Sequence, residues 1–320
     1  MTHGRQRTFE GRPLARPDEE VVDQGLGFDL DTLVSRRRML GVLGLSAAGL
    51  GLAACGGGSA GSSVAASATA ASGEIPDETA GPYPGDGSNG PDVLALSGIV
   101  RSDIRSSFGD ASGTAEGVPM TLELTVTDLA NGGAPFAGVA VYVWHCDRDG
   151  GYSLYSEGIT AENYLRGVQI ADADGTVTFT SVFPACYTGR WPHVHFEVYP
   201  DQASITDSTT AIATSQVAVP EDVCTAVYAT AGYESSVRTL AQVSLAEDNV
   251  FGDDDGASQL GTVTGDVTSG YAVSLTVGVD TRTTPTGGQL SGDGAPSGAP
   301  PSGGRGGARP PGTAPGSPTT

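Results

Sequence analysis

Two histidines separated by one residue are the side chains of this chain best placed to bind a metal ion. His193 and His195 stand at the start of a run, His193–Tyr199, that is a strand candidate. Residues two apart on a strand point to the same face of the sheet, so both imidazoles can meet a single ion. A His-x-His pair alone is weak evidence for a metal site, because surface strands also produce it by chance.

Two phenols and a guanidinium accompany this pair. Tyr187 and Arg190 precede the histidines, so that a phenol, a guanidinium and two imidazoles fall within nine residues of the sequence. Upstream, a predicted strand ends in the glycine-rich turn CDRDGG, and Tyr152 follows it directly. These neighbouring residues strengthen the evidence that the His-x-His pair is part of a metal site.

The elements that must position these side chains are mostly strands. Apolar and polar residues alternate in several runs, and Gly, Pro, Asn and Asp separate the runs as hairpins and loops require. The predicted strands are Met120–Val126, Val139–Val143, Val177–Phe183, His193–Tyr199, Ala211–Val219 and Tyr271–Val279. One short helix is predicted over Glu221–Ala231, opened by Pro220. This spacing predicts an all-β fold, with a β-sandwich core, long loops and short helices.

The two segments that carry the phenols and imidazoles resemble those of a known family. They are similar to the intradiol ring-cleavage dioxygenases, which include the catechol 1,2-dioxygenases and the protocatechuate 3,4-dioxygenases. In that family two Tyr and two His bind iron, the first Tyr follows a glycine-rich turn, and the second lies close to an Arg and both His. The stretches Thr79–Tyr83 and Tyr164–Gly167 also resemble the family, so the resemblance covers roughly residues 75–280.

The resemblance implies a ligand set and a reaction. The implied ligands of a non-haem Fe(III) ion are Tyr152, Tyr187, His193 and His195. Phenolate oxygen is a hard anionic donor that suits the ferric state, and a bound cation lowers the pKa of such a ligand. The implied reaction cleaves a small catechol-type diol with O2 between its hydroxylated carbons and yields a cis,cis-muconate. Arg190 would stabilise negative charge on the ring, and Tyr187 would leave the metal and take a substrate proton.

Other interpretations of the same residues stay open. Tyr142 and Tyr155 compete with Tyr152 for the ligand role, and His145 is expected to be structural. A non-catalytic β-sandwich tethered at the cell surface would carry the same strands and bind a ligand without turnover. A copper- or zinc-binding protein would use His145 together with the His-x-His pair.

The N-terminal residues 1–54 are predicted to be an export signal. Ser35–Arg38 resembles the core of a twin-arginine signal, and an apolar run of small residues follows it. This run of about 16 residues is short for a membrane span, which needs about 20. It ends in Leu52–Cys55, which resembles a lipobox, although an ordinary signal peptide with a chance cysteine is the alternative. We therefore expect an exported lipoprotein, at the cell surface or the periplasmic side of a membrane, tethered through lipidated Cys55.

Composition sets the remaining boundaries. Residues 55–73 are rich in Gly, Ser and Ala and predict a flexible tether, whereas 285–320 is rich in Gly and Pro and is expected to be disordered. The candidate domain is therefore 74–284.

The chain carries 37 acidic against 16 basic residues, and its net charge of −21 repels nucleic acid. An oligomer is compatible with the sequence, which does not fix the oligomeric state.

Three cysteines fall inside the domain. Cys146 and Cys186 lie near the two candidate ligand tyrosines, and Cys224 lies further on. Because exported proteins can form disulfides, we hypothesise a bond between Cys146 and Cys186 that braces the site.

Overall fold

The computed structural model describes residues 8–9, 12–13 and 73–286 of the chain. Nearly all of the predicted export signal, the candidate lipidation site Cys55, nearly all of the predicted tether and nearly all of the predicted tail lie outside the described residues. These predictions therefore stay predictions.

The chain divides into two units, Met1–Ala66 and Ser67–Thr320. In the first unit, the two-residue strands β1 (Thr8–Phe9) and β2 (Arg12–Pro13) pair in antiparallel orientation. The other described strands and helices belong to the second unit, which carries all the candidate site residues.

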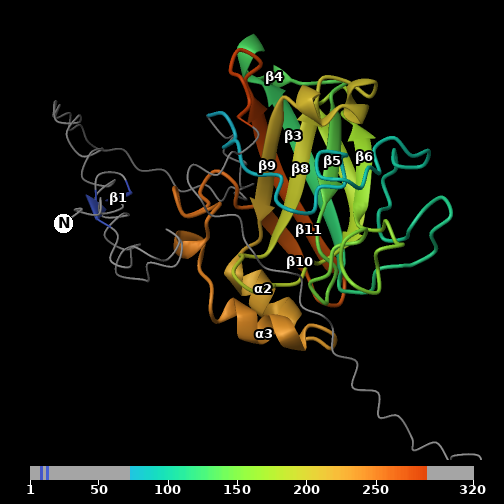
Figure 1. Cartoon of the computed structure of the whole chain (residues 1–320), viewed down its shortest axis with the longest axis vertical. Helices are drawn as coiled ribbons and strands as arrows, with labels where there is room; N and C mark the ends of the chain where they lie inside the picture. The colour runs from blue at the N-terminus through green and yellow to red at the C-terminus, as the bar shows by residue number, and fades with distance from the viewer. Residues whose placement is uncertain (1–7, 10–11, 14–72, 287–320) are drawn as a thin grey trace, which may run out of the picture. The chain divides into compact units, whose positions relative to one another are not determined.

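The second unit is built on two β-sheets (Figure 1). At the centre of the first sheet, β3 (Pro119–Asp128) pairs in parallel with β11 (Gly270–Val279) and in antiparallel with β7 (Thr176–Val182). Beyond β11 lies β10 (Thr262–Asp266), and the short β4 (Ala134–Pro135) pairs with the end of β3.

The second sheet carries the two histidines. Its strands are β6 (Arg166–Ile170), β5 (Ala140–Trp144), β8 (His193–Tyr199) and β9 (Ala213–Ala218), in that order and all antiparallel. The two sheets pack around one apolar core, so the prediction of an all-β sandwich is confirmed.

The two faces of the second sheet differ in chemistry. In β8, Val194 and Phe196 point into the apolar core between the sheets. His193 and His195 alternate with them and so point to the outer face. All seven residues of β8 are nevertheless buried, because a second apolar cluster covers that outer face. The chain before the first sheet contributes Ala80, Tyr83, Val93, Leu94, Ile99 and Phe108 to this cluster. The histidines therefore lie in a layer between the sheet and the N-terminal part of the domain.

The six predicted strands are all present, with small shifts at their ends, and the predicted bounds of β8 match the observed ones. The predicted helix is α2 (Glu221–Tyr228), which follows Pro220. A second helix, α3 (Glu234–Leu240), was not predicted, because its seven residues carry no clear apolar stripe. Strand β6 was also missed, since it begins with a charged residue, Arg166, that is buried in the fold. Within residues 73–286, 3₁₀ helices complete the elements: Leu129–Asn131, Ser204–Thr206, Ser208–Thr210 and Leu245–Glu247.

The hypothesis of a disulfide between Cys146 and Cys186 is wrong. Both thiols, like that of Cys224, are free and buried. Cys146 packs in the cluster on the outer face, with its Sγ 3.6 Å from the carbonyl oxygen of Ala185, whereas Cys186 packs in the core between the sheets, with its Sγ facing the carbonyl of Arg190. The two sulfurs thus belong to different layers of the fold.

No helix in the described part of the chain is long and apolar enough to cross a membrane.

Candidate metal centre

Four donor atoms from three segments of the chain converge on the outer face of the second sheet. The Oη of Tyr152 lies 3.4 Å from the Oη of Tyr187 and 3.5 Å from the Nε2 of His193. The Oη of Tyr187 lies 3.3 Å from the same nitrogen, and the Nε2 atoms of His193 and His195 are 3.0 Å apart. The structure thus brings together the four side chains that the sequence singles out as candidate ligands.

The spacing of these atoms fits donors arranged around one ion. Two donors that each lie about 2.1 Å from a metal are about 3.0 Å apart at a right angle and about 3.6 Å apart at 120°. The observed separations fall between 3.0 and 3.5 Å. The Nε2 atoms of His193 and His195 face each other at 3.0 Å, close enough for both to bind one cation.

Burial keeps both phenols protonated unless a cation is present. It raises the pKa of Tyr187 to about 12 and raises the pKa of Tyr152, which lies beside Tyr187, well above its ordinary value. A bound cation reverses this effect, because it stabilises the phenolate directly. Tyr152 is 1% exposed, whereas Tyr187 keeps partial exposure, so Tyr187 is the more accessible of the two.

Both imidazoles are neutral and have a nitrogen free to bind. Burial, with the charge of Arg190, lowers the pKa of His193 to about 3, and burial beside His193 lowers the pKa of His195 well below its ordinary value. The Nδ1 of His193 is hydrogen-bonded to the carbonyl of Trp191, which leaves the lone pair on Nε2. Two neutral imidazoles and two phenols that can ionise make a donor set suited to a hard, highly charged metal ion.

The loop that presents Tyr152 is organised by one carboxylate. The Oδ1 of Asp147 accepts the backbone N–H of Asp149 and of Gly151, and its Oδ2 accepts the hydroxyl of Tyr164. Gly150 has a φ of 87°, a left-handed conformation that a side chain would strain. The glycines of this turn therefore have a local reason, which is to reverse the chain just before Tyr152.

The loop that presents Tyr187 is held by α3. The hydroxyl of Ser236 accepts the backbone N–H of Cys186 at 3.0 Å, and the hydroxyl of Thr239 donates to the carbonyl of the same residue. Both contacts fix the backbone one residue before Tyr187. The helix that the sequence did not predict is thus the element that positions one of the phenols.

Arg190 lies beside Tyr187 in a buried polar network. Its Nε donates to the Oδ2 of Asp248 at 3.0 Å, and its Nη2 donates to the Oε1 of Gln216 at 2.6 Å. Burial alone would raise the pKa of Asp248, but Arg190 and the N–H of Trp191 lower it below its ordinary value. The ion pair is thus ionised, and the guanidinium is held in one orientation.

Sequence reasoning missed Asp248 and Gln216. Gln216 lies directly across from His195 in the pairing of β8 with β9, so its side chain shares the outer face. A cross-strand partner can be found only when the register of the two strands is known. Asp248 follows a 3₁₀ turn 58 residues after Arg190 and carries no sequence signal that separates it from the other acidic residues of this chain.

A segment before the first sheet, which includes Gly81 and Tyr83, covers the candidate metal centre. A Cβ added to Gly81 would lie 3.3 Å from the Cε1 of His195, and the ring of Tyr83 packs on that of Tyr152 with centroids 4.8 Å apart. The guanidinium of Arg166 donates to the carbonyl oxygens of Tyr83 and Pro84. Two stretches singled out in the sequence, Thr79–Tyr83 and Tyr164–Gly167, therefore meet over the centre.

The rival tyrosines have other partners. The hydroxyl of Tyr142 donates to the carbonyl of Pro84 and accepts from Arg166. The hydroxyl of Tyr155 accepts the N–H of Gly85 and donates to Asn89. Both hydroxyls are thus engaged with the covering segment and not with the four donors described above.

His145 also lies apart from the centre, as its structural interpretation predicted. Its Nδ1 is hydrogen-bonded to the carbonyl of Cys146 and its Nε2 to the hydroxyl of Ser181, each at 2.7 Å. Among the residues that the structure describes, no group of three or more His, Cys, Asp and Glu side chains is arranged to hold a metal. Both ring nitrogens of His145 are already hydrogen-bonded in the core. The alternative of a copper or zinc site that combines His145 with the His-x-His pair is therefore wrong.

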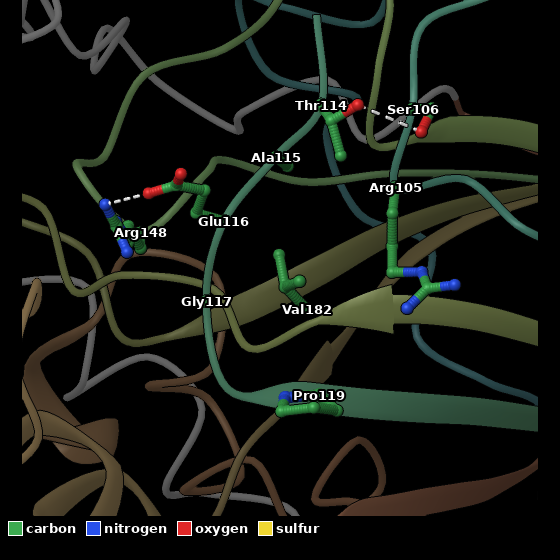
Figure 2. A pocket seen from close by; sticks show the side chains of 9 residues that line it. All are labelled: Arg105, Ser106, Thr114, Ala115, Glu116, Gly117, Pro119, Arg148 and Val182. Atoms are coloured by element: carbon green, nitrogen blue, oxygen red, sulfur yellow. Dashed lines mark hydrogen bonds and ion pairs between the residues drawn. The ribbon is translucent and has the colours of Figure 1, made fainter.

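A separate surface hollow of about 580 Å³ contains none of the candidate ligands. It is lined by parts of the segment 105–119 together with Arg148 and Val182. In Figure 2, Arg148 reaches across to Glu116, while Ser106 and Thr114 meet on another side of the hollow. Its cations are already paired, Arg105 with Asp103 and Arg148 with Glu116.

Comparison with known proteins agrees with the geometry. Residues 89–194 match a family model described as dioxygenase, and this range contains Tyr152, Tyr187, Arg190 and His193. The catechol 1,2-dioxygenase of Pseudomonas sp. (strain EST1001) is 40% identical over 72 residues, which are 22% of this chain and 23% of that protein. The chlorocatechol 1,2-dioxygenase of Rhodococcus opacus is 36% identical over 55 residues, 17% of this chain and 21% of that protein. The chain thus spans less than a quarter of the length of these two relatives.

The solved structures extend the likeness to the whole domain. An intradiol ring-cleavage dioxygenase from Tetranychus urticae has a TM-score of 0.50 and 22% identity, over 66% of this chain and 96% of that one. A second dioxygenase structure has a TM-score of 0.52 and 22% identity, over 67% of this chain and 98% of that one. These values show a shared fold. The chain thus shares its fold with the intradiol ring-cleavage dioxygenase of Tetranychus urticae, and residues 89–194 are similar to the dioxygenase family.

Proposed function

We propose that the domain is a non-haem Fe(III) intradiol dioxygenase. It would cleave a catechol-type ring between its two hydroxylated carbons with O2 and yield a cis,cis-muconate-type product. The observation that carries the proposal is the convergence of two phenols and two imidazoles, in which four of the distances between donor atoms are 3.0–3.5 Å. The family of the matched segment and the names of the relatives support the same reaction.

The donor set suits ferric iron more than the other common metals. Two phenolates supply hard anionic oxygens and two charges, and two imidazoles complete the set without adding charge. Zinc sites are mostly built from thiolate, imidazole and carboxylate, and calcium prefers carboxylate and carbonyl oxygen. When bound by these four residues, ferric iron would withdraw electron density from a coordinated diol and make its ring reactive toward O2.

The residues around the four ligands would supply the other functions that the reaction needs. Tyr187 is the more accessible phenol, so its Oη is the site expected to accept a proton from a substrate hydroxyl. Arg190 would present a fixed positive charge to the electron-rich ring, because Asp248 and Gln216 hold its guanidinium in place. The covering segment that includes Gly81 and Tyr83 would help to keep water away from the reacting ring.

The test combines colour with oxygen uptake. Charge transfer from tyrosinate to Fe(III) colours a protein roughly red-brown, so the iron-loaded full chain should absorb in the visible and consume O2 with catechols. Tyr187→Phe and Tyr152→Phe should each shift or weaken the band and abolish most of the uptake. Tyr155→Phe is the matched control, because its hydroxyl contacts Gly85 and Asn89 and not the four donors.

A colourless protein at full iron occupancy would contradict the proposal. Colour without oxygen uptake on catechol, protocatechuate, hydroxyquinol or larger diols would instead favour a binding module. The same screen would identify the ring substituents that the site accepts.

The same proposal includes a location. The twin-arginine-like Ser35–Arg38 and the lipobox-like Leu52–Cys55 support export of the domain and its attachment to a membrane through Cys55. Labelling cells with a radioactive fatty acid tests this, since Cys55→Ala should lose both the label and the membrane fraction. Equal labelling of the wild type and this variant would contradict lipidation at Cys55.

A further inference from the structure

The two histidines of the metal centre are held in different ways. The Nδ1 of His193 has a hydrogen-bond partner, the carbonyl of Trp191. The Nδ1 of His195 is buried and has no hydrogen-bond partner among the described residues. Metal-binding histidines usually have their second nitrogen fixed by such a partner. Some other contact must therefore set the orientation of the His195 ring.

An indole supplies that contact. Trp144 and His195 are paired directly across strands β5 and β8, so their side chains lie next to each other on the outer face. The two rings are stacked, with centroids 4.9 Å apart and an angle of 6° between their planes. Trp144 is 0% exposed and His195 is 3% exposed, so the two stacked rings are buried inside the protein and do not lie at its surface.

The indole is itself fixed from behind. Tyr142 lies two residues earlier on the same face of β5 and stacks on Trp144, with centroids 4.9 Å apart and planes at 22°. The hydroxyl of Tyr142 is anchored by Arg166 and by the carbonyl of Pro84. Because the Nε1 of Trp144 has no hydrogen-bond partner within the described part of the chain, the indole holds His195 through its flat surface and not through a polar bond.

A glycine limits the movement of the imidazole at its edge. Gly81 has a φ of 72°, and a Cβ at this position would lie 3.3 Å from the Cε1 of His195. The covering segment therefore comes close to the ring where the stack leaves its edge uncovered. The imidazole is confined by two surfaces, the indole and the backbone at Gly81.

We propose that Trp144 is a positioning residue of the metal centre, whose stacked indole sets the plane of the His195 ring for metal binding. This inference rests on the proposed function in so far as the metal is iron. The stack also contributes to binding energy, because a metal withdraws electron density from the imidazole and the electron-rich indole face attracts the resulting positive charge. The indole of Trp144 thus holds His195 in place, as the carbonyl of Trp191 does for His193.

Three variants of the full chain separate positioning from general stability. Trp144→Leu removes the stack, and we expect the affinity for ferric iron, measured by competition with a chelator, to fall about tenfold to a hundredfold. The tyrosinate charge-transfer band should shift in the same variant. Trp144→Phe keeps an aromatic face and loses no hydrogen bond, so it should restore most of the affinity and the band. Phe179→Leu, in the core between the sheets, is the control: it should lower the melting temperature but leave iron affinity and the band unchanged.

A measurement without metal tests the stack independently of the proposed reaction. In the iron-free full chain with isotope-labelled histidine, the ring protons of His195 should be shifted upfield by the indole. The shift should disappear in Trp144→Leu and persist in part in Trp144→Phe. The signal is identified by its loss in His195→Asn.

Each outcome bears on one of the two proposals. A Trp144→Leu protein that binds iron as tightly as the wild type, with an unchanged band, would overturn the inference, and so would an unshifted His195 signal in the wild type. If the wild-type chain retains no ferric iron, the proposed function fails. The upfield shift and its loss in Trp144→Leu then decide by themselves whether the indole positions the ring.

Discussion

The guanidinium of Arg166 donates to the carbonyl oxygen of Tyr83 at 2.9 Å and so joins strand β6 to the segment that covers the candidate metal centre. Arg166 is 1% exposed and has no carboxylate among its hydrogen-bond partners in the described structure. Its donors instead meet five acceptors, which are the carbonyls of Tyr83, Pro84 and Ser153 and the hydroxyls of Tyr142 and Ser153. The fold thus uses one buried cation to tie together the backbone on two sides of the centre.

This arrangement predicts that Arg166→Lys is strongly destabilising. Lysine has three donors where the site offers five acceptors, so at least two of these acceptors lose their hydrogen bond to the cation. The free energy of unfolding should fall by about 3 kcal/mol, at about 1.5 kcal/mol for each lost hydrogen bond to the charge. Denaturant unfolding measures this, and exposed Arg238→Lys should change stability by less than about 0.5 kcal/mol. Equal effects of the two substitutions would show that the five acceptors do not depend on the guanidinium.

The buried pair of Arg190 and Asp248 predicts a pH-dependent loss in Asp248→Asn. Removing one partner of a buried ion pair leaves the other charge uncompensated and costs about 3–5 kcal/mol of stability. Because Arg190 lowers the pKa of Asp248 in the folded state, the contribution is present above the ordinary value of 3.8 and is lost as the pH falls through the folded value. The difference between wild type and variant should therefore shrink in acid.

A surface pair of the same type provides the control. Arg105 and Asp103 form a two-bond ion pair whose side chains are 43% and 51% exposed. Asp103→Asn should change stability by less than about 1 kcal/mol, because exposed ion pairs contribute little. A loss in Asp248→Asn no larger than in this control would contradict the structural importance of the buried pair.

Glu78 predicts a second pH dependence, of opposite sign. Burial, followed by the nearby Asp253, raises the pKa of Glu78 from 4.5 to about 8. Between these values the unfolded chain has released the proton and the folded chain has kept it, so stability falls as the pH rises through this window. Glu78→Gln should flatten the melting temperature over the window and raise it at alkaline pH relative to the wild type. Asp253→Asn should move the upper end of the window to lower pH, and an unaltered profile in both variants would contradict the assignment.

The hydrogen bond between His145 and Ser181 predicts a variant that separates structure from metal binding. Ser181→Ala leaves the buried Nε2 of His145 without its partner and should lower stability by about 1–3 kcal/mol. Iron content and the visible band should not change, because neither residue contacts the four donors. Metal analysis after dialysis measures this, and a loss of metal in Ser181→Ala would restore His145 as a candidate ligand.

The sequence by itself determined the parts of this protein that depend on short-range regularity. Alternation with a period of two predicted six strands, and the same period puts His193 and His195 on one face of their strand. Tyr187 and Arg190 lie close enough to that strand to be singled out by spacing. The turn before Tyr152 could be found because a left-handed backbone needs glycine, here Gly150.

Only the tertiary structure decided which side chains meet. Alternation cannot say whether a strand face points to a core or to a covering layer, and β8 is buried on both. Tyr152 and Tyr155 lie in one loop, but only the hydroxyl of Tyr152 comes within 3.5 Å of His193. Asp248 reaches Arg190 across 58 residues of sequence, and Trp144 meets His195 through a strand register that local patterns do not encode. Contacts of this kind are fixed by the packing of distant segments, and local propensity does not determine that packing.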